Sequence, residues 1–300
     1  MRPLKVGVQL PEIERVVPWP ELRDMIRAIE DNGFDSIWVG DHLLYRMEDG
    51  SARGPWETWS TLAAIAMLTE RVEFGPFVAC TAFLNPGLLA KKAATIDEMS
   101  RGRLVLGLGA GWNQAEFDAY GIAFDQPVSR FEEAFTIIRT LLREGHIDFE
   151  GRFYTARDLE LLPRGPRPDG PPLMVGTTGE RMLRITLPYV TSWNAWYRHT
   201  RNRPEGVRPL REMVDRVGGE VGRDPADVER TVAVLVHATG GRGRETGGNV
   251  EPLGGSPEQI AEGLRAYADE GIGHVQLVID PIAVASIEEV ARALPFLDAG

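Results

Sequence analysis

The chain has 300 residues, of which 43% are hydrophobic, 26% charged and 8% aromatic. This composition is typical of a packed globular protein and excludes collagen-like repeats and extended disorder. The 33 Lys and Arg against 44 Asp and Glu give a formal net charge of −11. Such a charge disfavours nucleic acid and anionic membrane surfaces as partners, because like charges repel.

The cellular location is addressed by the apolar runs and by the cysteine content. The longest apolar run, 62–68, is far shorter than the roughly 20 residues that span a bilayer. The first residues lack the apolar core of a signal peptide, so we expect none. With the single cysteine Cys80 we expect no internal disulfide and a cytoplasmic protein.

Short apolar runs typical of β-strands alternate with helical patterns along the chain. In chain order, strands are predicted at 4–10, 34–39, 72–79, 104–108, 173–175, 191–196, 232–236 and 274–279. Helices are predicted after most of them, at 22–29, 57–69, 86–99, 129–142 and 180–187, with two more near the carboxyl terminus. The capping-box pattern, serine followed three residues later by Glu or Gln, predicts helix starts at Ser129, Ser256 and Ser286.

Eight strand–helix alternations favour an α/β fold, a closed (β/α)8 TIM barrel formed by one domain over residues 1–300. An open doubly wound sheet is the alternative. Three segments are too long for ordinary loops, 44–56, 149–172 and 238–255. The first and third are expected on the catalytic face, and the glycine-rich stretch 240–255 is expected to be a mobile lid.

Active sites of such barrels lie at the carboxyl ends of the strands, so the residues after each strand are the candidates. Asp41 and His42 follow the second strand and offer a carboxylate and an imidazole for acid–base chemistry. The alternative is a loop cap by Asp41 and a surface histidine. After the fourth strand, Gly109, Gly111, Trp112 and Asn113 can approach, stack on and hydrogen-bond a planar ligand, although a tight turn explains the glycines almost as well.

The fifth predicted strand runs into a helix through six residues that suit an anion, Gly176, Thr177, Thr178, Gly179, Glu180 and Arg181. Exposed amides at a helix start, two hydroxyls and an arginine form a phosphate cradle. The alternative is that Thr178 is an ordinary helix N-cap.

Metal and nucleophile chemistry are less favoured. A metal site would need Asp41, His42, His237 and Asp280 to converge, but the first strand ends without a His-x-His pair, so no metal is predicted. Cys80 fits a packing role. No Gly-x-Ser-x-Gly nucleophile elbow occurs in the chain.

Several longer motifs occur in a fixed order. They are 37–44 (IWVGDHLL), 75–81 (GPFVACT), 85–91 (NPGLLAK), 100–112 (SRGRLVLGLGAGW), 129–134 (SRFEEA), 149–154 (FEGRFY), 176–181 (GTTGER) and 192–194 (SWN). Together they resemble the luciferase-like monooxygenase superfamily over nearly the whole chain. The resemblance is closest to the branch of oxidoreductases that use the deazaflavin coenzyme F420.

The resemblance implies a barrel, usually a homodimer, with its cofactor at the carboxyl end. Asp41 and His42 would face the reactive ring, with His42 as proton donor or acceptor. Pro76, Phe77 and Val78 would form a bulge behind the ring, often with a cis non-proline peptide. The remaining implied cofactor contacts are Gly109, Gly111, Trp112 and Asn113 at the ring edge and 176–181 at the phosphate.

One residue departs from the family pattern. Sugar-phosphate dehydrogenases of this branch carry a catalytic glutamate where this chain has Trp112, which argues against glucose-6-phosphate oxidation and suits a more apolar substrate. The expected function is hydride transfer between F420 and a small organic substrate. The alternatives are an FMN-dependent monooxygenase that uses O2, a barrel that binds flavin without turnover and, last, a metal hydrolase.

Overall fold

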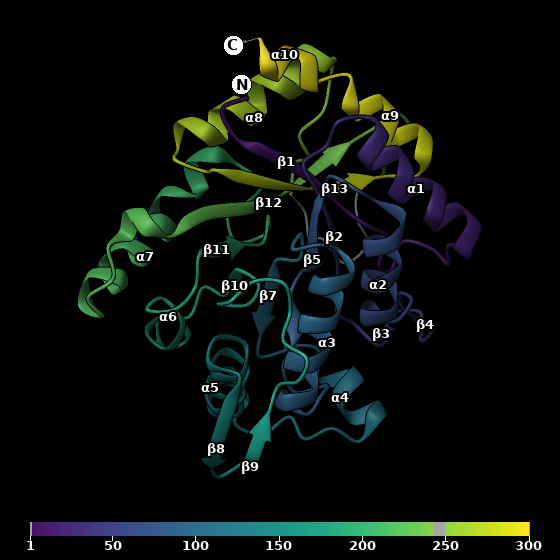
Figure 1. Cartoon of the computed structure of the whole chain (residues 1–300). Helices are drawn as coiled ribbons and strands as arrows, with labels where there is room; N and C mark the ends of the chain where they lie inside the picture. Colours follow the sequence, from purple (N-terminus) through teal and green to yellow (C-terminus); the bar gives the residue numbers. More distant parts are fainter. Residues whose placement is uncertain (1, 243–249, 300) are drawn as a thin grey trace.

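The computed structural model describes residues 2–242 and 250–299. Within these residues, nine parallel strands form one sheet in the order β5-β2-β1-β13-β12-β11-β10-β7-β6 (Figure 1). The strands are β1 (Lys5–Gln9), β2 (Ser36–Val39), β5 (Glu73–Pro76), β6 (Ala79–Cys80), β7 (Leu106–Gly109), β10 (Leu173–Gly176), β11 (Ser192–Ala195), β12 (Glu229–His237) and β13 (His274–Asp280). A parallel bridge between Phe74 and Leu104 brings the two ends of the sheet together. Because β5 and β6 are two segments of one barrel strand, the result is a β/α barrel rather than an open sheet.

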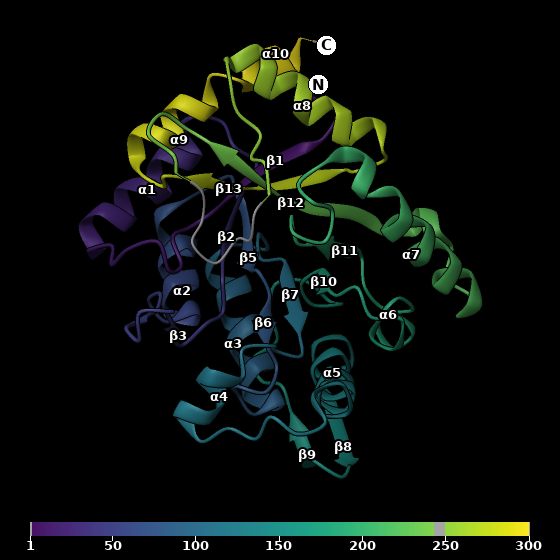
Figure 2. The same ribbon diagram turned by 180° about the vertical axis from the view of Figure 1, so that it is seen from behind.

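Helices surround this sheet, as Figures 1 and 2 show from opposite sides. They are α1 (Trp19–Asp31), α2 (Thr58–Leu68), α3 (Pro86–Met99), α4 (Gln114–Tyr120), α5 (Pro127–Glu144), α6 (Glu180–Thr186), α7 (Arg208–Glu220), α8 (Pro257–Asp269), α9 (Val284–Ala291) and α10 (Leu294–Asp298), with short 3-10 turns η1 (Pro204–Gly206) and η2 (Pro225–Asp227). Outward strand residues such as Val6 and Val8 are fully buried against them. This layer holds most of the apolar core. In the part of the chain that the structure describes, no helix is long and apolar enough to cross a membrane.

The barrel interior holds a second, smaller apolar core and a group of hydrogen-bonded polar side chains. The apolar part comprises Trp38, Phe77, Met174, Tyr197, Ala233, Leu235 and Val278. Asn194 donates from Nδ2 to Thr231 Oγ1 at 2.8 Å and to Gln276 Oε1 at 2.9 Å. Pairing of this kind offsets the cost of burying polar side chains.

The predicted barrel and its eight strands are confirmed, and the long segments hold more structure than expected. A hairpin of β3 (Tyr45–Arg46) and β4 (Ala52–Arg53) occupies much of 44–56. A second hairpin, β8 (His146–Glu150) with β9 (Thr155–Glu160), covers the first part of 149–172. In 238–255, residues 243–249 lie outside the described residues, so the predicted lid stays a prediction.

Two of the three predicted capping boxes are wrong. The helix assigned to Ser129 begins earlier, at Pro127, because proline is favoured in a first helical turn. The helix assigned to Ser286 begins at Val284, and Ser286 is buried within it. The third box is confirmed, since the Ser256 side chain accepts from Gln259 N and the Gln259 side chain accepts from Ser256 N.

Candidate active site

The carboxyl end of the barrel has a smooth wall on the side of β7 and β10. Both strands end on an inward-facing glycine, Gly109 and Gly176. A Cβ at Gly109 would lie 2.7 Å from Val78 Cγ2, and one at Gly176 would lie 3.1 Å from the same atom. Val78 therefore packs directly on backbone, and no side chain projects into the barrel from these two positions. A planar ring can lie against such a surface.

The segment between β5 and β6 has the bulged form that the resemblance implied. The Phe77–Val78 peptide bond is cis. The Phe77 ring is buried, 5.4 Å from the Trp38 ring and 6.0 Å from the Trp196 ring. Pro76, Phe77 and Val78 thus lie together beside the glycine wall.

Asp41 joins the end of β2 to this bulge. Its Oδ2 accepts a hydrogen bond from the backbone N–H of Cys80 at 2.8 Å. Burial raises the pKa of the Asp41 carboxyl to about 6, although this hydrogen bond and the neighbouring His42 act in the opposite direction. The acid is buried but can still ionise near neutral pH.

His42 is enclosed by two carboxylates that the sequence analysis did not single out. Its Nδ1 lies 3.0 Å from Glu116 Oε1. Its Nε2 lies 3.5 Å from Glu12 Oε1. Glu116, on α4, is 1% exposed and Glu12, three residues beyond β1, is 6% exposed. The predicted pair of Asp41 and His42 therefore becomes a site of four ionisable groups.

Both carboxylates are fixed by further hydrogen bonds. Glu116 Oε2 accepts from the backbone N–H of Leu43 at 2.8 Å. Glu12 Oε1 accepts from the Tyr45 hydroxyl at 3.1 Å, and Glu12 Oε2 accepts from Gln9 Nε2 at 3.2 Å. These bonds hold both acids toward the His42 ring.

The electrostatics of His42 follow from this enclosure. Burial lowers the pKa of His42, but the hydrogen bond with Glu116 and the charges of Glu12, Glu116 and Asp41 outweigh it, so the net pKa is raised above its ordinary value. The imidazole therefore holds a proton more readily than one in water.

An aromatic surface adjoins His42. The Tyr45 ring lies 4.6 Å and the Trp112 ring 5.6 Å from the His42 ring. Trp112 is 66% exposed, so most of its indole is available to a ligand. Asn113 donates from Nδ2 to the Leu44 carbonyl at 2.9 Å and joins the two loops that carry these rings.

The loop after β10 is partly exposed, and several of its groups have hydrogen-bond partners of their own. Trp193 Nε1 donates to the Thr177 carbonyl at 2.7 Å, and Gly179 N donates to Thr177 Oγ1 at 3.0 Å. The N-cap of α6 is Gly179, so the alternative in which Thr178 caps the helix is wrong. Arg181 donates to Ser129 Oγ and Glu132 Oε2, both at 3.0 Å.

Three of the candidate residues form ion pairs away from His42. Glu180 forms ion pairs with Arg184 on the same helix, α6, and with Arg216 on α7. His237 and Asp280 lie together at the ends of β12 and β13, with Nε2 and Oδ2 3.2 Å apart. Across residues 2–242 and 250–299, no three His, Cys, Asp or Glu side chains are grouped to hold a metal ion.

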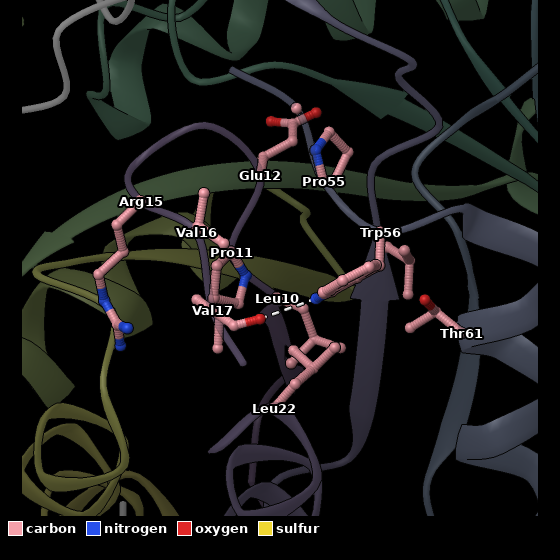
Figure 3. Close-up of a pocket in the computed structure, with 12 residues that line it drawn as sticks. Leu10, Pro11, Glu12, Arg15, Val16, Val17, Leu22, Pro55, Trp56 and Thr61 are labelled. Carbon is pink, nitrogen blue, oxygen red and sulfur yellow. Dashed lines mark hydrogen bonds between the residues drawn. The ribbon is translucent and has the colours of Figure 1, made fainter. Parts of the chain in front are cut away.

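A pocket of about 140 Å³ lies outside the barrel, between the β1–α1 loop and residues 54–56 (Figure 3). Its lining includes Leu10, Leu22 and Val39, which belong to the core between sheet and helices. Trp56 crosses it and donates from Nε1 to the Val17 carbonyl at 2.7 Å. It is thus distinct from the barrel mouth, although Glu12 borders both.

The sequence comparisons identify the family. The model of the luciferase-like monooxygenase family matches residues 4–245, and the chain belongs to this family. It is 31% identical to 5,10-methylenetetrahydromethanopterin reductase of Archaeoglobus fulgidus over 183 residues. This match covers 61% of this chain and 50% of that protein. It is 31% identical over 252 residues to phthiodiolone/phenolphthiodiolone dimycocerosates ketoreductase of Mycobacterium tuberculosis, a match that covers 77% of this chain and 64% of that protein. It is 30% identical over 325 residues to F420-dependent glucose-6-phosphate dehydrogenase of Amycolatopsis mediterranei, with 99% and 90% covered. The chain thus spans only half to two thirds of the length of the first two relatives.

Solved structures share the fold. An F420-dependent secondary alcohol dehydrogenase in complex with an F420-acetone adduct superposes with a TM-score of 0.82, at 17% identity and 99% coverage of both chains. Coenzyme F420-dependent tetrahydromethanopterin reductase from Methanopyrus kandleri gives 0.78, at 17% identity, covering 98% of this chain and 99% of the other. A type II Baeyer-Villiger monooxygenase of Pseudomonas putida in complex with FMN gives 0.75, at 16% identity, with 97% and 98% covered. At these identities the likeness shows the barrel fold alone.

Proposed function

We propose that the protein is an F420-dependent oxidoreductase that transfers a hydride between the deazaflavin and a small organic substrate. The observation that carries the proposal is His42, held between buried carboxylates beside a wall of glycine backbone. A relative that matches nearly the whole chain is named as F420-dependent, and so are two proteins of the same fold.

The residues at the barrel mouth fit a ring with a phosphate-bearing side chain. Val78, which packs on the backbone of Gly109 and Gly176, would accept the flat face of the ring, with Gly111, Trp112 and Asn113 near its edge. The partly exposed loop 176–179 and Arg181 would hold the phosphate through amides, hydroxyls and charge. When bound, F420 supplies or accepts the hydride.

The chain's own side chains then manage the proton. His42 exchanges it with the substrate at Nε2, because Nδ1 is bound to Glu116. Asp41 fixes the bulge beside the ring through the Cys80 amide. Trp112 and Tyr45 cover the approach to His42 with apolar surface, which excludes water and suits an apolar substrate rather than a sugar phosphate.

A second candidate function is that of an FMN-dependent monooxygenase, which the FMN complex of the same fold supports. The two functions differ in their reaction with oxygen. Under air, reduced FMN on the enzyme would consume O2, whereas a reduced deazaflavin would persist until a substrate is added. Oxygen consumption that depends on FMN would therefore overturn the F420 proposal.

The direct test of activity is anaerobic turnover. Purified protein is mixed with reduced F420 and small carbonyl compounds, or with oxidised F420 and the matching alcohols, and the F420 absorbance is followed. We expect a change with at least one apolar pair and none with glucose-6-phosphate. Turnover with FMN and oxygen alone would contradict this.

We also propose that the protein is a cytoplasmic homodimer. On the outer face of α2, Met67 is 68% exposed beside the half-buried Ala63 and Ala64, and Leu88 of α3 is 48% exposed. An apolar helix face of this kind is normally covered, here by a second copy of the chain. Light scattering should give twice the chain mass, and Met67→Asp should give the chain mass.

The proposal of a cytoplasmic location rests on the single cysteine. The free, buried Cys80 fits a reducing compartment.

A further inference from the structure

The two ring nitrogens of His42 each face a buried carboxylate. Glu116 comes from α4 on the Nδ1 side, and Glu12 comes from the β1–α1 loop on the Nε2 side. Further titratable groups near the ring are Asp41, which precedes His42 in the segment after β2, and Tyr45, which donates to Glu12. The His42 side chain is 14% exposed.

A neutral imidazole cannot satisfy this arrangement. It carries one N–H, so one of its nitrogens would present a lone pair to a carboxylate. An imidazolium presents N–H groups to both acids and removes one unit of negative charge from a site that already contains Asp41. Since nearby negative charges stabilise a positive charge, the arrangement favours the protonated ring.

The two carboxylates have different contacts. Glu116 Oε1 forms a hydrogen bond with Nδ1 at 3.0 Å, and Glu116 Oε2 accepts from Leu43 N. Both carboxylate oxygens of Glu116 are therefore hydrogen-bonded. Glu12 lies 3.5 Å from Nε2, which is a charge contact rather than a good hydrogen bond. The Nε2 proton is therefore attracted to this side of the ring but remains available to a ligand oxygen.

We propose that Glu12 and Glu116 form a carboxylate clamp that keeps His42 an imidazolium in the ligand-free enzyme and so presets the site for carbonyl reduction. The inference rests on the proposed function. As a hydride adds to the carbonyl carbon, a C–H bond forms and the carbonyl π pair moves to oxygen. That oxygen takes the Nε2 proton, leaving an alcohol, a neutral His42 and oxidised F420. Glu116 is a positioning residue in this step.

The test is the titration of His42 in the ligand-free protein, followed by the chemical shifts of its ring nitrogens in NMR spectra. The midpoint of the parent protein should lie above the ordinary histidine value of about 6.5. Glu116→Gln should lower the midpoint by about one pH unit or more, and Glu12→Gln should lower it as well. Glu262→Gln, at an exposed position of α8, is the matched control and should leave the midpoint unchanged.

The overturning results are specific. A parent midpoint at or below the ordinary histidine value of about 6.5 would overturn the clamp, as would an unchanged midpoint in folded Glu116→Gln and Glu12→Gln. If Glu116→Gln does not fold, the parent and Glu12→Gln titrations decide. In turnover, the alkaline limit of reduction should move with the NMR midpoint in each variant. Failure of F420 to bind would defeat the proposed function but leave the titration result standing, so the two failures are distinguishable.

Discussion

At the scale of single residues, His42 is defined by its neighbours from three separate elements. His42 lies in the segment after β2, Glu12 lies in the β1–α1 loop and Glu116 lies on α4. A general acid or base contributes roughly 10²- to 10⁴-fold to a rate. We therefore expect His42→Ala to lower kcat by ~10²-fold or more while changing F420 affinity much less.

The control for this prediction is His146→Ala, which removes an exposed imidazole far from the barrel mouth in β8. It should turn over at the parent rate. Steady-state kinetics and a fluorescence titration separate the two effects. A His42→Ala enzyme with normal cofactor binding and the parent kcat would show that the imidazole is structural.

Asp41 should impose a measurable stability cost at neutral pH. Its folded pKa is about 6, above the unfolded value of 3.8, so the folded state binds more protons between these values and stability falls as the pH rises through this window. Asp41→Asn keeps an oxygen that can accept from Cys80 N. Its free energy of unfolding relative to the parent should rise by about 2 to 3 kcal/mol between pH 4 and pH 7. Urea unfolding at both pH values measures this, and a constant difference would contradict it.

At the scale of elements, Arg103 joins the end of α2 to the start of β5. Its guanidinium donates to the carbonyls of Ala66 at 2.9 Å, Thr69 at 2.7 Å and Val72 at 2.9 Å. The carbonyls of Ala66 and Thr69 are orphan acceptors at the C-terminus of α2, where a cation is also favoured by the helix dipole. Lysine cannot reproduce this fork of donors.

We expect Arg103→Lys to lower the free energy of unfolding by about 2 to 3 kcal/mol, since several charged hydrogen bonds are lost at once. Urea unfolding is the measurement. Arg27→Lys on the exposed face of α1 serves as control and should stay within about 0.5 kcal/mol of the parent. Equal stability of the two variants would remove Arg103 from its assigned role.

The sequence predicts the barrel better than it predicts the site. Buried parallel strands appear as short apolar runs, so all eight were found. Helix α4 has seven residues, with Phe117 its only buried apolar side chain among those described, so no helical period indicates it and Glu116 was missed. Glu12 lies as close to the end of β1 as His42 lies to the end of β2, but a single loop glutamate carries no pattern that separates it from a solvated one. The β8–β9 hairpin is mostly exposed and carries no clear alternation.

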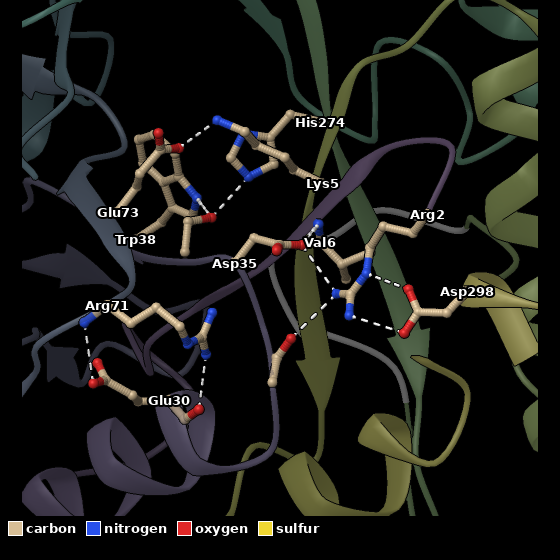
Figure 4. Close-up of polar contacts among 12 residues, drawn as sticks. Arg2, Lys5, Val6, Glu30, Asp35, Trp38, Arg71, Glu73, His274 and Asp298 are labelled. Carbon is tan, nitrogen blue, oxygen red and sulfur yellow. Dashed lines mark hydrogen bonds and ion pairs between the residues drawn. The ribbon is translucent and has the colours of Figure 1, made fainter. Parts of the chain in front are cut away.

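At the scale of the whole molecule, the amino-terminal end of the barrel is joined by polar contacts (Figure 4). Arg2 bonds Asp35 at 3.0 Å and Asp298 at 2.9 Å, which links both ends of the chain. His274 Nε2 lies 2.7 Å from Ser36 Oγ inside the barrel, and Ser36 also accepts from Trp38 Nε1 at 2.7 Å. His274 is thus buried among uncharged partners.

This burial should make the fold sensitive to acid. Burial lowers the pKa of His274 to about 3, with Lys5 adding to the effect. Between pH 6.5 and 3 the unfolded chain binds a proton that the folded chain does not, so the His274 contribution is lost as the pH falls below 6.5, by up to about 1.4 kcal/mol per pH unit. His274→Gln should therefore gain stability relative to the parent between pH 6.5 and 4.5 in urea unfolding. A pH-independent difference would contradict the assignment.

Equilibrium binding shows which cofactor the protein takes. F420 and FMN are titrated separately into the purified apo-protein, and binding is followed by fluorescence and calorimetry. We expect F420 to bind more tightly than FMN, because a relative that matches nearly the whole chain is named as F420-dependent. Micromolar binding of FMN with no detectable binding of F420 would contradict it.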